Sequence, residues 1–264
     1  MNALTRATSD SATMVGRQLR HQLRYPSLTL MLAGMPIVLL LLFVYVFGGA
    51  MGAGLGGPSG GGRAEYLDYI VPGILLITVA MVAQGTAIGV ATDMTEGIIA
   101  RFRTMDIARV SVLTGHVVGA LFQTLVALAI VTGVALLLGF RSSAGPVEWI
   151  AAAGLLCAVA FALTWLTVAL GMVSDSVETA SNVPMPLMFL PFLSSGFVPT
   201  DTLPTGLRWF AEYQPFTPIS EVLRGLLTGT GIGDAAALAL AWCAAIALAS
   251  YIWAKRLYNR RSAG

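Results

Sequence analysis

The sequence predicts an all-α membrane protein with six transmembrane helices, and three observations support this fold class. Of the 264 residues, 56% are hydrophobic and only 11% are charged, whereas a soluble domain carries roughly 25% charged residues. The mean hydropathy of +0.80 is too high for a soluble globule. The apolar residues also gather into six stretches, each approaching the roughly 20 residues that a helix needs to cross a bilayer. Soluble enzymes, coiled coils and disordered tails are therefore excluded.

The six stretches form a single transmembrane domain over residues 1–264. The predicted spans are 27–47, 69–91, 112–138, 149–173, 183–198 and 235–253. The fifth span is short and is broken by Pro184, Pro186 and Pro191, which interrupt the helical hydrogen bonds. Irregular backbone at membrane depth is tolerated only where protein or a water-filled cavity covers it. We therefore expect the fifth span to be covered in one of these two ways.

The distribution of basic residues predicts that both termini are cytoplasmic. Six spans place both termini on the same side, and cytoplasmic loops carry an excess of Lys and Arg. With the termini inside, 11 basic residues are cytoplasmic and 4 are external, and the opposite orientation would invert this ratio. The four external residues are Arg63, Arg141, Arg208 and Arg224.

Residues 10–24, before the first span, have the spacing of an amphipathic helix. Val15, Leu19 and Leu23 recur on one face, and the opposite face is basic, with Arg17, Arg20, His21 and Arg24. Such a helix lies on the inner leaflet. It is either a simple positive-inside anchor or a surface on which a cytoplasmic partner docks.

The chain shows no site that would bind a cofactor or hydrolyse ATP. Nine of the fifteen residues in 48–62 are glycine, but this segment lacks the lysine of a phosphate-binding loop and is predicted to be a flexible external linker. The only lysine, Lys255, is not preceded by a GxxxxG pattern. Cys157 and Cys243 lie in apolar runs without a CxxC spacing, which favours buried apolar residues over a disulfide or a zinc site.

The segment after the second span combines balanced charges with an apolar stripe. It contains three acidic residues and three basic ones, namely Asp93, Glu96 and Asp106 against Arg101, Arg103 and Arg109. Its apolar residues recur at helical spacing: Ile98, Ile99, Phe102 and Met105. This pattern predicts a short amphipathic helix over 96–108, because such a stripe is buried either in the headgroups or on a partner protein. A solvated connector is the alternative.

The segment after the fifth span is too apolar to be a free external loop. We predict two short helices within 203–228, the first over about 204–213 and the second over about 218–227. Thr217 is the expected N-cap of the second helix, Pro218 its first residue and Gly229 the residue after its end. Glu221 and Arg224 are one turn apart and can pair. We expect both helices to be re-entrant, dipping into the outer leaflet and capping a pathway.

These features together resemble the membrane subunit of ABC-2 type exporters, and within that family the daunorubicin-resistance permease group. The matching motifs are E-G-x-x-x-R after the second span (Glu96, Gly97, Arg101) and a C-terminal signature. That signature runs S-G-F-V-P-x-x-x-L-P-x-x-L-R-W and then P-F-T-P-I-S-E-V-L-R-G. Its matched residues are Ser195, Gly196, Pro199, Pro204, Pro215, Glu221 and Arg224. The resemblance covers about residues 10–258. This chain has Met105-Asp106-Ile107 where family members often carry a proline.

The resemblance implies a permease that pairs with a second permease, of the same or a related chain, and binds two copies of a separate ATPase that holds ATP and Mg²⁺. The helix over 96–108 would then be the coupling helix seated in the ATPase. The coupling residues are Glu96, Gly97, Ile98, Arg101, Phe102, Arg103 and Met105. Cargo would move between the permeases or laterally from the bilayer. The residues that could line its path, or alternatively pack helices within one subunit, are Thr78, Met81, Gln84, Phe192, Ser194 and Ser195.

The sequence thus predicts a non-enzymatic, multi-pass transport subunit of a bacterial inner membrane. The cargo is expected to be hydrophobic or amphipathic, such as a drug, a polyketide or a lipid. Nucleic acid is not expected as a partner, because the net charge is only +2. Three alternatives remain: an ion-coupled secondary transporter, a structural subunit, and an intramembrane enzyme. The enzyme would need Ser195 beside His116, which the predicted spans place at opposite ends of the bilayer.

Overall fold

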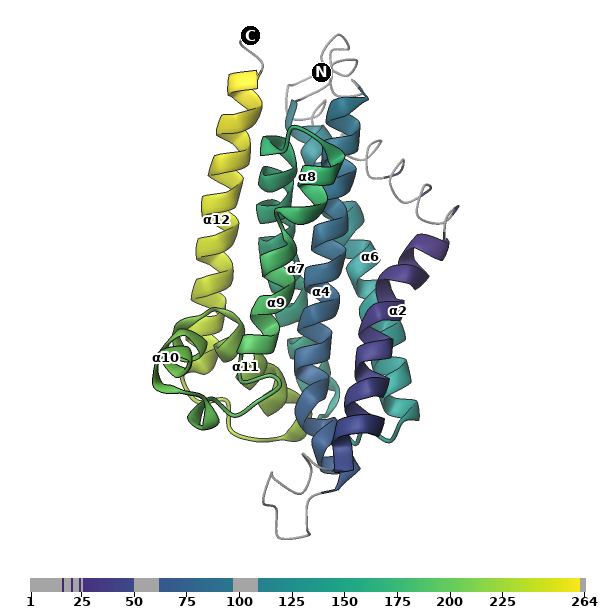
Figure 1. Cartoon of the computed structure of the whole chain (residues 1–264), viewed down its shortest axis with the longest axis vertical. Helices are drawn as coiled ribbons and strands as arrows, with labels where there is room; N and C mark the ends of the chain where they lie inside the picture. Colours follow the sequence, from purple (N-terminus) through teal and green to yellow (C-terminus); the bar gives the residue numbers. More distant parts are fainter. Residues whose placement is uncertain are drawn as a thin grey trace.

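The computed structural model describes residues 26–49, 62–96 and 109–261, together with Gly16, Arg20 and Arg24. All regular secondary structure in these residues is helical. Five of the helices are long and apolar enough to cross a membrane, and they run side by side along the long axis of the molecule (Figure 1). They are α2 (Pro26–Leu42), α4 (Arg63–Thr95), α6 (Arg109–Leu137), α7 (Pro146–Val173) and α12 (Ala235–Arg261). We call the end where α4 and α12 finish the upper end, and the opposite end the lower end (Figure 1).

These five helices lie where the sequence predicts spans one to four and six. α2 continues into a π-helical turn over Phe43–Phe47, so the first apolar stretch ends as expected. α4 is longer than the predicted 69–91, because Glu65 and Asp68 extend its lower end. Acidic residues suit the first turns of a helix, where backbone N–H groups are unpaired. Asp68 also accepts a hydrogen bond from the backbone N–H of Arg141 (3.1 Å), which ties the 138–145 connection to α4.

The predicted fifth span is not a continuous helix. Its prolines divide it into α9 (Met185–Phe189) and a 3₁₀ turn (Leu190–Leu193), and a short helix, α8 (Val177–Asn182), precedes it; we call residues 177–197 the broken segment. This broken segment runs antiparallel to α4, since Gln84 contacts Ser181 and Tyr69 contacts Ser195. The two α4 residues are fifteen positions apart, which corresponds to about 22 Å of helix. The broken segment therefore follows α4 over much of the apolar layer.

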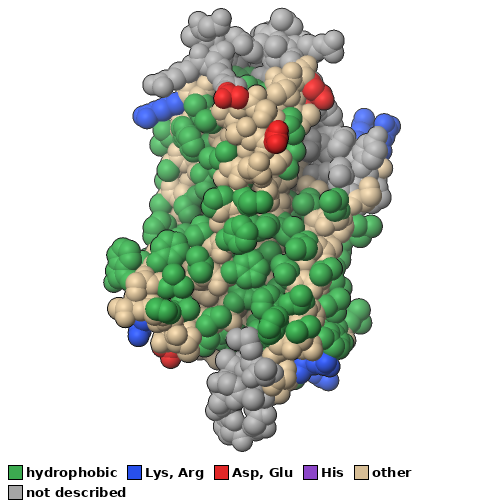
Figure 2. Space-filling view, viewed as in Figure 1, with side chains coloured by type: hydrophobic (Ala, Val, Ile, Leu, Met, Phe, Trp, Pro, Cys, Tyr) green, Lys and Arg blue, Asp and Glu red, His purple; other side chains and the backbone are tan. Residues whose placement is uncertain are grey.

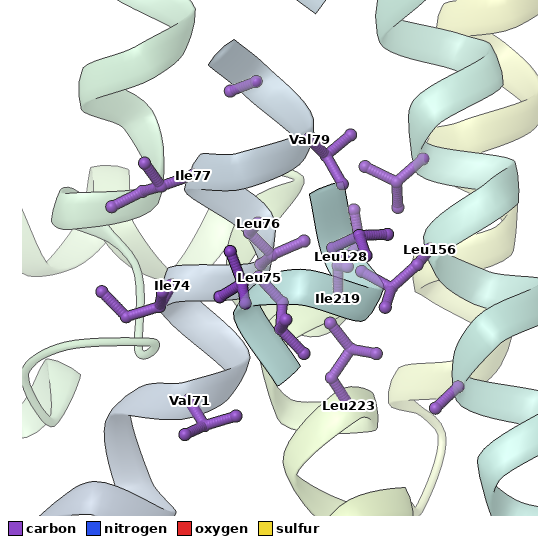
Figure 3. Close-up of a cluster of buried hydrophobic side chains, with 14 of the residues drawn as sticks. Val71, Ile74, Leu75, Leu76, Ile77, Val79, Leu128, Leu156, Ile219 and Leu223 are labelled. Carbon is purple, nitrogen blue, oxygen red and sulfur yellow. The ribbon is translucent and has the colours of Figure 1, made fainter. Parts of the chain in front are cut away.

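Two further helices lie at the lower end, close to the two ranges that the sequence predicts to be helical. α10 (Thr205–Tyr213) lies at the edge of the molecule, whereas α11 (Phe216–Thr228) is inserted among α4, α7 and α12 (Figure 1). α11 buries one whole face, including Ile219 and Leu223. In Figure 3, Ile219 lies beside Leu75 of α4, Leu128 of α6 and Leu156 of α7, and Leu223 lies next to it, whereas Ile74 and Ile77 point to the opposite side of α4. The second helix of this pair is therefore part of the main core.

α4 and α7 form the centre of the bundle. The apolar window of α4 is 72% buried and that of α7 is 67% buried, against 33% or less for α2, α6 and α12. The outer helices instead expose a broad apolar belt, with charged side chains gathered at the upper and lower ends (Figure 2). Exposed large apolar side chains such as Met31, Leu137 and Ile150 belong to this belt. Such a surface is typical of contact with lipid or with another membrane subunit.

Several predicted segments lie outside the described residues. These are the interfacial helix over 10–24, except for Gly16, Arg20 and Arg24, residues 50–61 of the glycine-rich linker, and the coupling helix after Glu96. Gly48 and Gly49, predicted to begin the flexible linker, are helical instead. Both cysteines are free thiols, with Cys243 buried and Cys157 partly buried.

The close packing of α4 on α7 depends on Gly171. A Cβ at this position would lie 2.6 Å from the backbone oxygen of Ala87, and a backbone atom cannot swing aside. We expect Gly171→Ala to destabilise the protein by about 2 kcal/mol through overpacking. Gly154→Ala on the same helix is the control, since nothing lies within 4 Å of its Cβ position. Thermal stability of the detergent-purified protein should fall for Gly171→Ala alone. Equal stability of the two variants would contradict this packing.

Candidate functional site

The end of the broken segment, at Ser194–Phe197, is a site where backbone polar groups lack helical partners. In an apolar layer each such group must be satisfied by protein. The N–H of Ser195 donates to Oγ1 of Thr217 (3.3 Å), and the N–H of Gly196 donates to Oγ of Ser194 (3.1 Å). The C=O of Ser195 accepts from the hydroxyl of Tyr69 (2.9 Å) and from the guanidinium of Arg224. Side chains of α4, α11 and the broken segment itself therefore replace the missing helical hydrogen bonds.

Arg224 links the three elements at this site. Its guanidinium carbon lies 4.0 Å from the centre of the Tyr69 ring, in a cation–π geometry. The same group donates to the carbonyl of Ser195. Glu221, predicted to pair with Arg224, is exposed, and the arginine is directed instead toward Tyr69 and Ser195. A single charged side chain of α11 thereby holds both α4 and the broken segment.

The start of α11 differs from the prediction. The helix begins at Phe216, so Thr217 lies inside its first turn and is not the N-cap. Oγ1 of Thr217 instead donates to the carbonyl of Ala211 (2.5 Å) and accepts from Ser195, because these two backbone groups have no helical partner. The predicted end is confirmed: Gly229 has φ +73°, the left-handed conformation that glycine adopts without strain.

A close backbone approach and an aromatic cluster complete the site around Ser194–Phe197, which we call the lower site. A Cβ on Gly73 of α4 would lie 2.9 Å from the carbonyl oxygen of Gly196, so both glycines are needed for this contact. Phe192 and Phe197 stack with their centroids 4.8 Å apart. Phe43, in the π-helical turn after α2, packs on Phe197 at 5.3 Å. The first apolar helix, α4 and the broken segment thus meet here.

The six candidate pathway residues all lie on α4 or on the broken segment, but they differ in exposure. Thr78, Ser194 and Ser195 are buried, whereas Met81, Gln84 and Phe192 keep some accessible surface. Thr78 donates to the carbonyl of Ile74 within its own helix (2.8 Å). Gln84 donates to the carbonyl of Ser181 beside the proline break (2.8 Å). Of the three residues on α4, Gln84 thus contacts the broken segment, whereas the hydrogen bond of Thr78 stays within its own helix.

Only one of the candidate coupling residues is described. Glu96 follows the last turn of α4, is exposed, and its backbone N–H donates to the carbonyl of Thr92 (2.9 Å). The other candidates, Gly97, Ile98, Arg101, Phe102, Arg103 and Met105, lie outside the described residues. The described chain resumes at Arg109, where α6 begins, so this segment joins the upper ends of α4 and α6.

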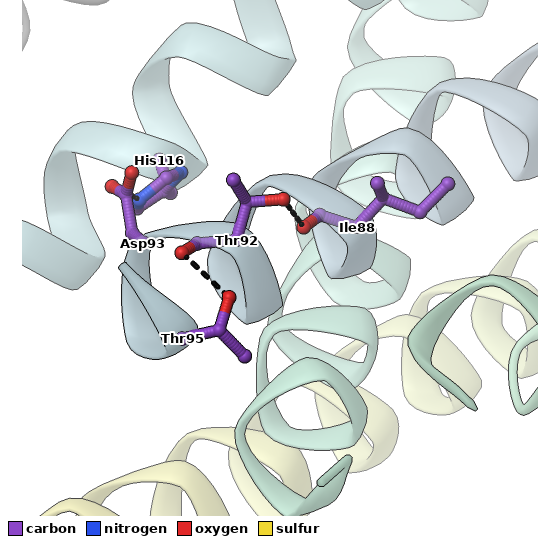
Figure 4. Close-up of polar contacts among 5 residues, drawn as sticks. All are labelled: Ile88, Thr92, Asp93, Thr95 and His116. Atoms are coloured by element: carbon purple, nitrogen blue, oxygen red, sulfur yellow. Dashed lines mark hydrogen bonds and ion pairs between the residues drawn. The ribbon is translucent and has the colours of Figure 1, made fainter. Parts of the chain in front are cut away.

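A contact that was not predicted joins these same upper ends. Nε2 of His116 on α6 lies 3.0 Å from Oδ2 of Asp93 in the last turn of α4, and both side chains are largely buried (Figure 4). Asp93 is 24 positions beyond Tyr69 on α4, which is about 36 Å of helix. His116 therefore lies at the opposite end of the bundle from Ser195, as the sequence predicts. The available signal in the sequence was an acidic residue just after the end of the second predicted span and a histidine just inside the third.

Comparison with known proteins identifies the family. Residues 11–228 match the ABC-2 type transporter family. The chain belongs to this family of membrane permeases. It is 30% identical over 264 residues to the daunorubicin resistance ABC transporter permease protein DrrB1 of Streptomyces coeruleorubidus, covering 98% of this chain and 89% of that protein. It is 27% identical over 203 residues to a protein of Mycobacterium tuberculosis described as a "probable doxorubicin resistance ABC transporter permease protein DrrC", covering 74% and 71%. The resemblance noted in the sequence is thus confirmed.

Family membership gives the lower site its context. This ABC-2 permease is a multi-pass membrane protein whose described spans agree with the family assignment. Unsatisfied polar groups in the apolar layer of such a protein cost several kcal/mol, and the break at Ser194–Phe197 and the partly buried Arg224 both present polar groups that need partners. The contacts of Tyr69 and Arg224 with Ser195 are therefore structural requirements of this site.

The two contacts of Tyr69 can be separated by substitution. Tyr69→Phe removes the hydrogen bond to Ser195 but keeps the ring beneath Arg224, so we expect a loss of about 0.6 kcal/mol. Tyr69→Leu also removes the cation–π contact, which is worth about 2 kcal/mol when desolvated, and should be clearly less stable. Tyr213→Phe, on exposed α10, is the control. Thermal unfolding in detergent measures all three, and equal stability of Tyr69→Phe and Tyr69→Leu would contradict the role of the ring.

Proposed function

We propose that this chain is the membrane-spanning permease subunit of an ATP-driven exporter. It would move a hydrophobic or amphipathic cargo, such as a drug, a polyketide or a lipid-like molecule, out of the cytoplasm or the inner leaflet. The observation that most supports this proposal is the 30% identity, over 98% of the chain, to a daunorubicin resistance ABC transporter permease. Because the chain carries no phosphate-binding loop, ATP and Mg²⁺ would be bound by a separate ATPase, present in two copies.

In this proposal the upper end faces the cytoplasm of a bacterial cell, and both termini are cytoplasmic. The basic residues support this orientation: Arg20, Arg24, Lys255 and Arg256 belong to the upper segments, while Arg63 and Arg141 belong to the lower end. The broken segment supplies the fifth of six crossings. α10 and α11 are the re-entrant pair, and the exposed Trp209 and Tyr213 of α10 suit the outer membrane–water interface.

The transport cycle would act through the segment over 96–108. Closure of the ATPase dimer would push on this coupling helix, and two paired permeases, of the same or related chains, would shift between inward- and outward-facing states. Met81, Gln84 and Phe192 have surface available for cargo in the present arrangement. Thr78, Ser194 and Ser195 would reach cargo only when the broken segment moves relative to α4, because all three are buried.

Co-purification from the native membrane tests the proposal. The tagged chain should bring down a P-loop ATPase in stoichiometric amount, and the eluate should hydrolyse ATP. Phe102→Ala should reduce the amount of ATPase recovered by about tenfold, because aromatic anchors at interfaces typically contribute 1–2 kcal/mol or more. Phe122→Ala, at a Phe that α6 exposes on its apolar surface, is the matched control and should leave recovery unchanged.

The outcomes of this experiment separate the proposal from its alternatives. A permease that never recovers an ATPase, even after crosslinking, would overturn it in favour of a secondary transporter or a structural subunit. Equal recovery with Phe102→Ala and Phe122→Ala would show that the ATPase binds elsewhere.

The orientation is tested separately by cysteine labelling. In a background of Cys157→Ala and Cys243→Ala, single Ser59→Cys and Ser262→Cys variants place one thiol in the linker and one at the C-terminus. A membrane-impermeant maleimide added to intact cells should label residue 59 directly and residue 262 only after permeabilisation. The reverse pattern would show that the termini are external.

A further inference from the structure

We infer that the Asp93–His116 contact is a positioning contact, which makes the upper ends of α4 and α6 move as one body with the coupling segment. This inference rests on the proposed function. The contact joins the two helices that the segment over 97–108 connects, Asp93 in the last turn of α4 and His116 in the second turn of α6 (Figure 4). It therefore joins the two helix ends between which the proposed ATPase-binding segment runs.

The chemistry of the two groups determines which of them donates the hydrogen bond. A carboxylate only accepts hydrogen bonds, so the facing Nε2 of His116 carries the hydrogen and donates across 3.0 Å. Hydrogen bonds to an ionised group are about twice as strong as neutral ones. The side chains of His116 and Asp93 are only 7% and 14% exposed, so water competes little for either partner. Removing either side chain would remove this hydrogen bond between the two helices.

The imidazole also lies against the backbone of α4. A Cβ on Gly89, one turn before Asp93, would be 4.0 Å from Cε1 of His116. The ring therefore rests on the face of α4 that Gly89 and Asp93 share. The described residues contain no group of three or more His, Cys, Asp and Glu side chains that could hold a metal ion. A contact between helices is thus the role that this geometry supports.

A separate apolar cluster connects this contact to the rest of the bundle. The upper cluster is distinct from the main core and draws on four helices. Its members are Val90, Leu113, Val117, Trp165, Val168, Ala169, Met172, Ala254 and Tyr258. Val90 precedes Asp93 by three positions on α4, and Val117 follows His116 directly. Force on the coupling segment would reach α7 and α12 through this cluster from both α4 and α6, and the Asp93–His116 contact would keep those two helix ends moving together.

The test uses the complex of the permease with its co-purified ATPase in proteoliposomes. The readouts are the ATPase recovered, the ATP hydrolysis rate relative to the free ATPase, and uptake of daunorubicin as the probe. His116→Phe keeps a ring but loses the N–H. We expect ATPase recovery and thermal stability to stay at the wild-type level, while the permease-dependent part of the hydrolysis rate falls at least about fivefold. Where the wild type takes up the probe, transport per ATP should fall with it.

Matched variants separate positioning from general packing. Thr92→Val removes a hydroxyl whose hydrogen bond goes to Ile88 of the same helix (2.9 Å), and it should behave as wild type. Asp93→Leu removes the same contact by changing the residue on α4. It replaces His116→Phe in the test if that variant does not accumulate in the membrane. The double variant Asp93→His with His116→Asp restores the pair in reversed order and should recover at least half of the lost stimulation. If the single variants failed only because packing at either position was damaged, the double variant would show no such recovery.

Each result has one meaning. Loss of stimulation in both breaking variants with rescue by the double variant supports the inference. Wild-type stimulation in His116→Phe or Asp93→Leu overturns the inference alone, because the ATPase still binds and responds. A wild-type permease that recovers no ATPase overturns the proposed function, and the inference with it.

Discussion

The arrangement of this permease depends on one constraint: a backbone that leaves the helical conformation inside an apolar layer must find its hydrogen-bond partners in other segments. The prolines of the fifth apolar stretch create that situation, and the structure resolves it at Ser195. The N–H of this residue is satisfied by Thr217, and its C=O by Tyr69 and Arg224. Because these partners come from α4 and α11, the break fixes where both helices lie.

The central position of α4 follows from the same requirement. Near its lower end it supplies Tyr69 to the break, and further along it supplies Gln84 to the carbonyl of Ser181. Gly73 allows the backbone at Gly196 to approach, and Gly171 of α7 allows α7 to approach on the other side. Because α4 packs closely against both the broken segment and α7, little of its surface is left to contact lipid. This accounts for its burial, in contrast to the apolar outer faces of α2, α6 and α12.

The two ends of the molecule carry different kinds of polar contact. At the lower end, the guanidinium of Arg224, hydroxyl groups and backbone groups connect α4, α11 and the broken segment. A continuous helix would not need these contacts, because its backbone groups would bond to each other. At the upper end, Asp93 and His116 join two helices that are already adjacent in the chain. The lower contacts therefore maintain the broken segment, whereas the upper one controls how two helix ends move relative to each other. α4 carries residues of both contacts, about 36 Å apart, and in the proposed cycle it connects the coupling segment with the broken segment.

The sequence by itself determined the all-helical membrane class, the five long apolar helices, the proline break in the fifth apolar stretch and the family. These depend on local properties: apolar run length, proline spacing, and short motifs such as that around Ser195 and Gly196. It also located the end of α11, because Gly229 marks a helix terminus in any context. Tertiary structure decided the rest. The role of Thr217 as a partner of Ser195, the direction of Arg224 toward Tyr69, and the pairing of Asp93 with His116 all depend on which helices become neighbours. That choice is made by side-chain packing and close glycine contacts between distant segments, and no local pattern encodes it.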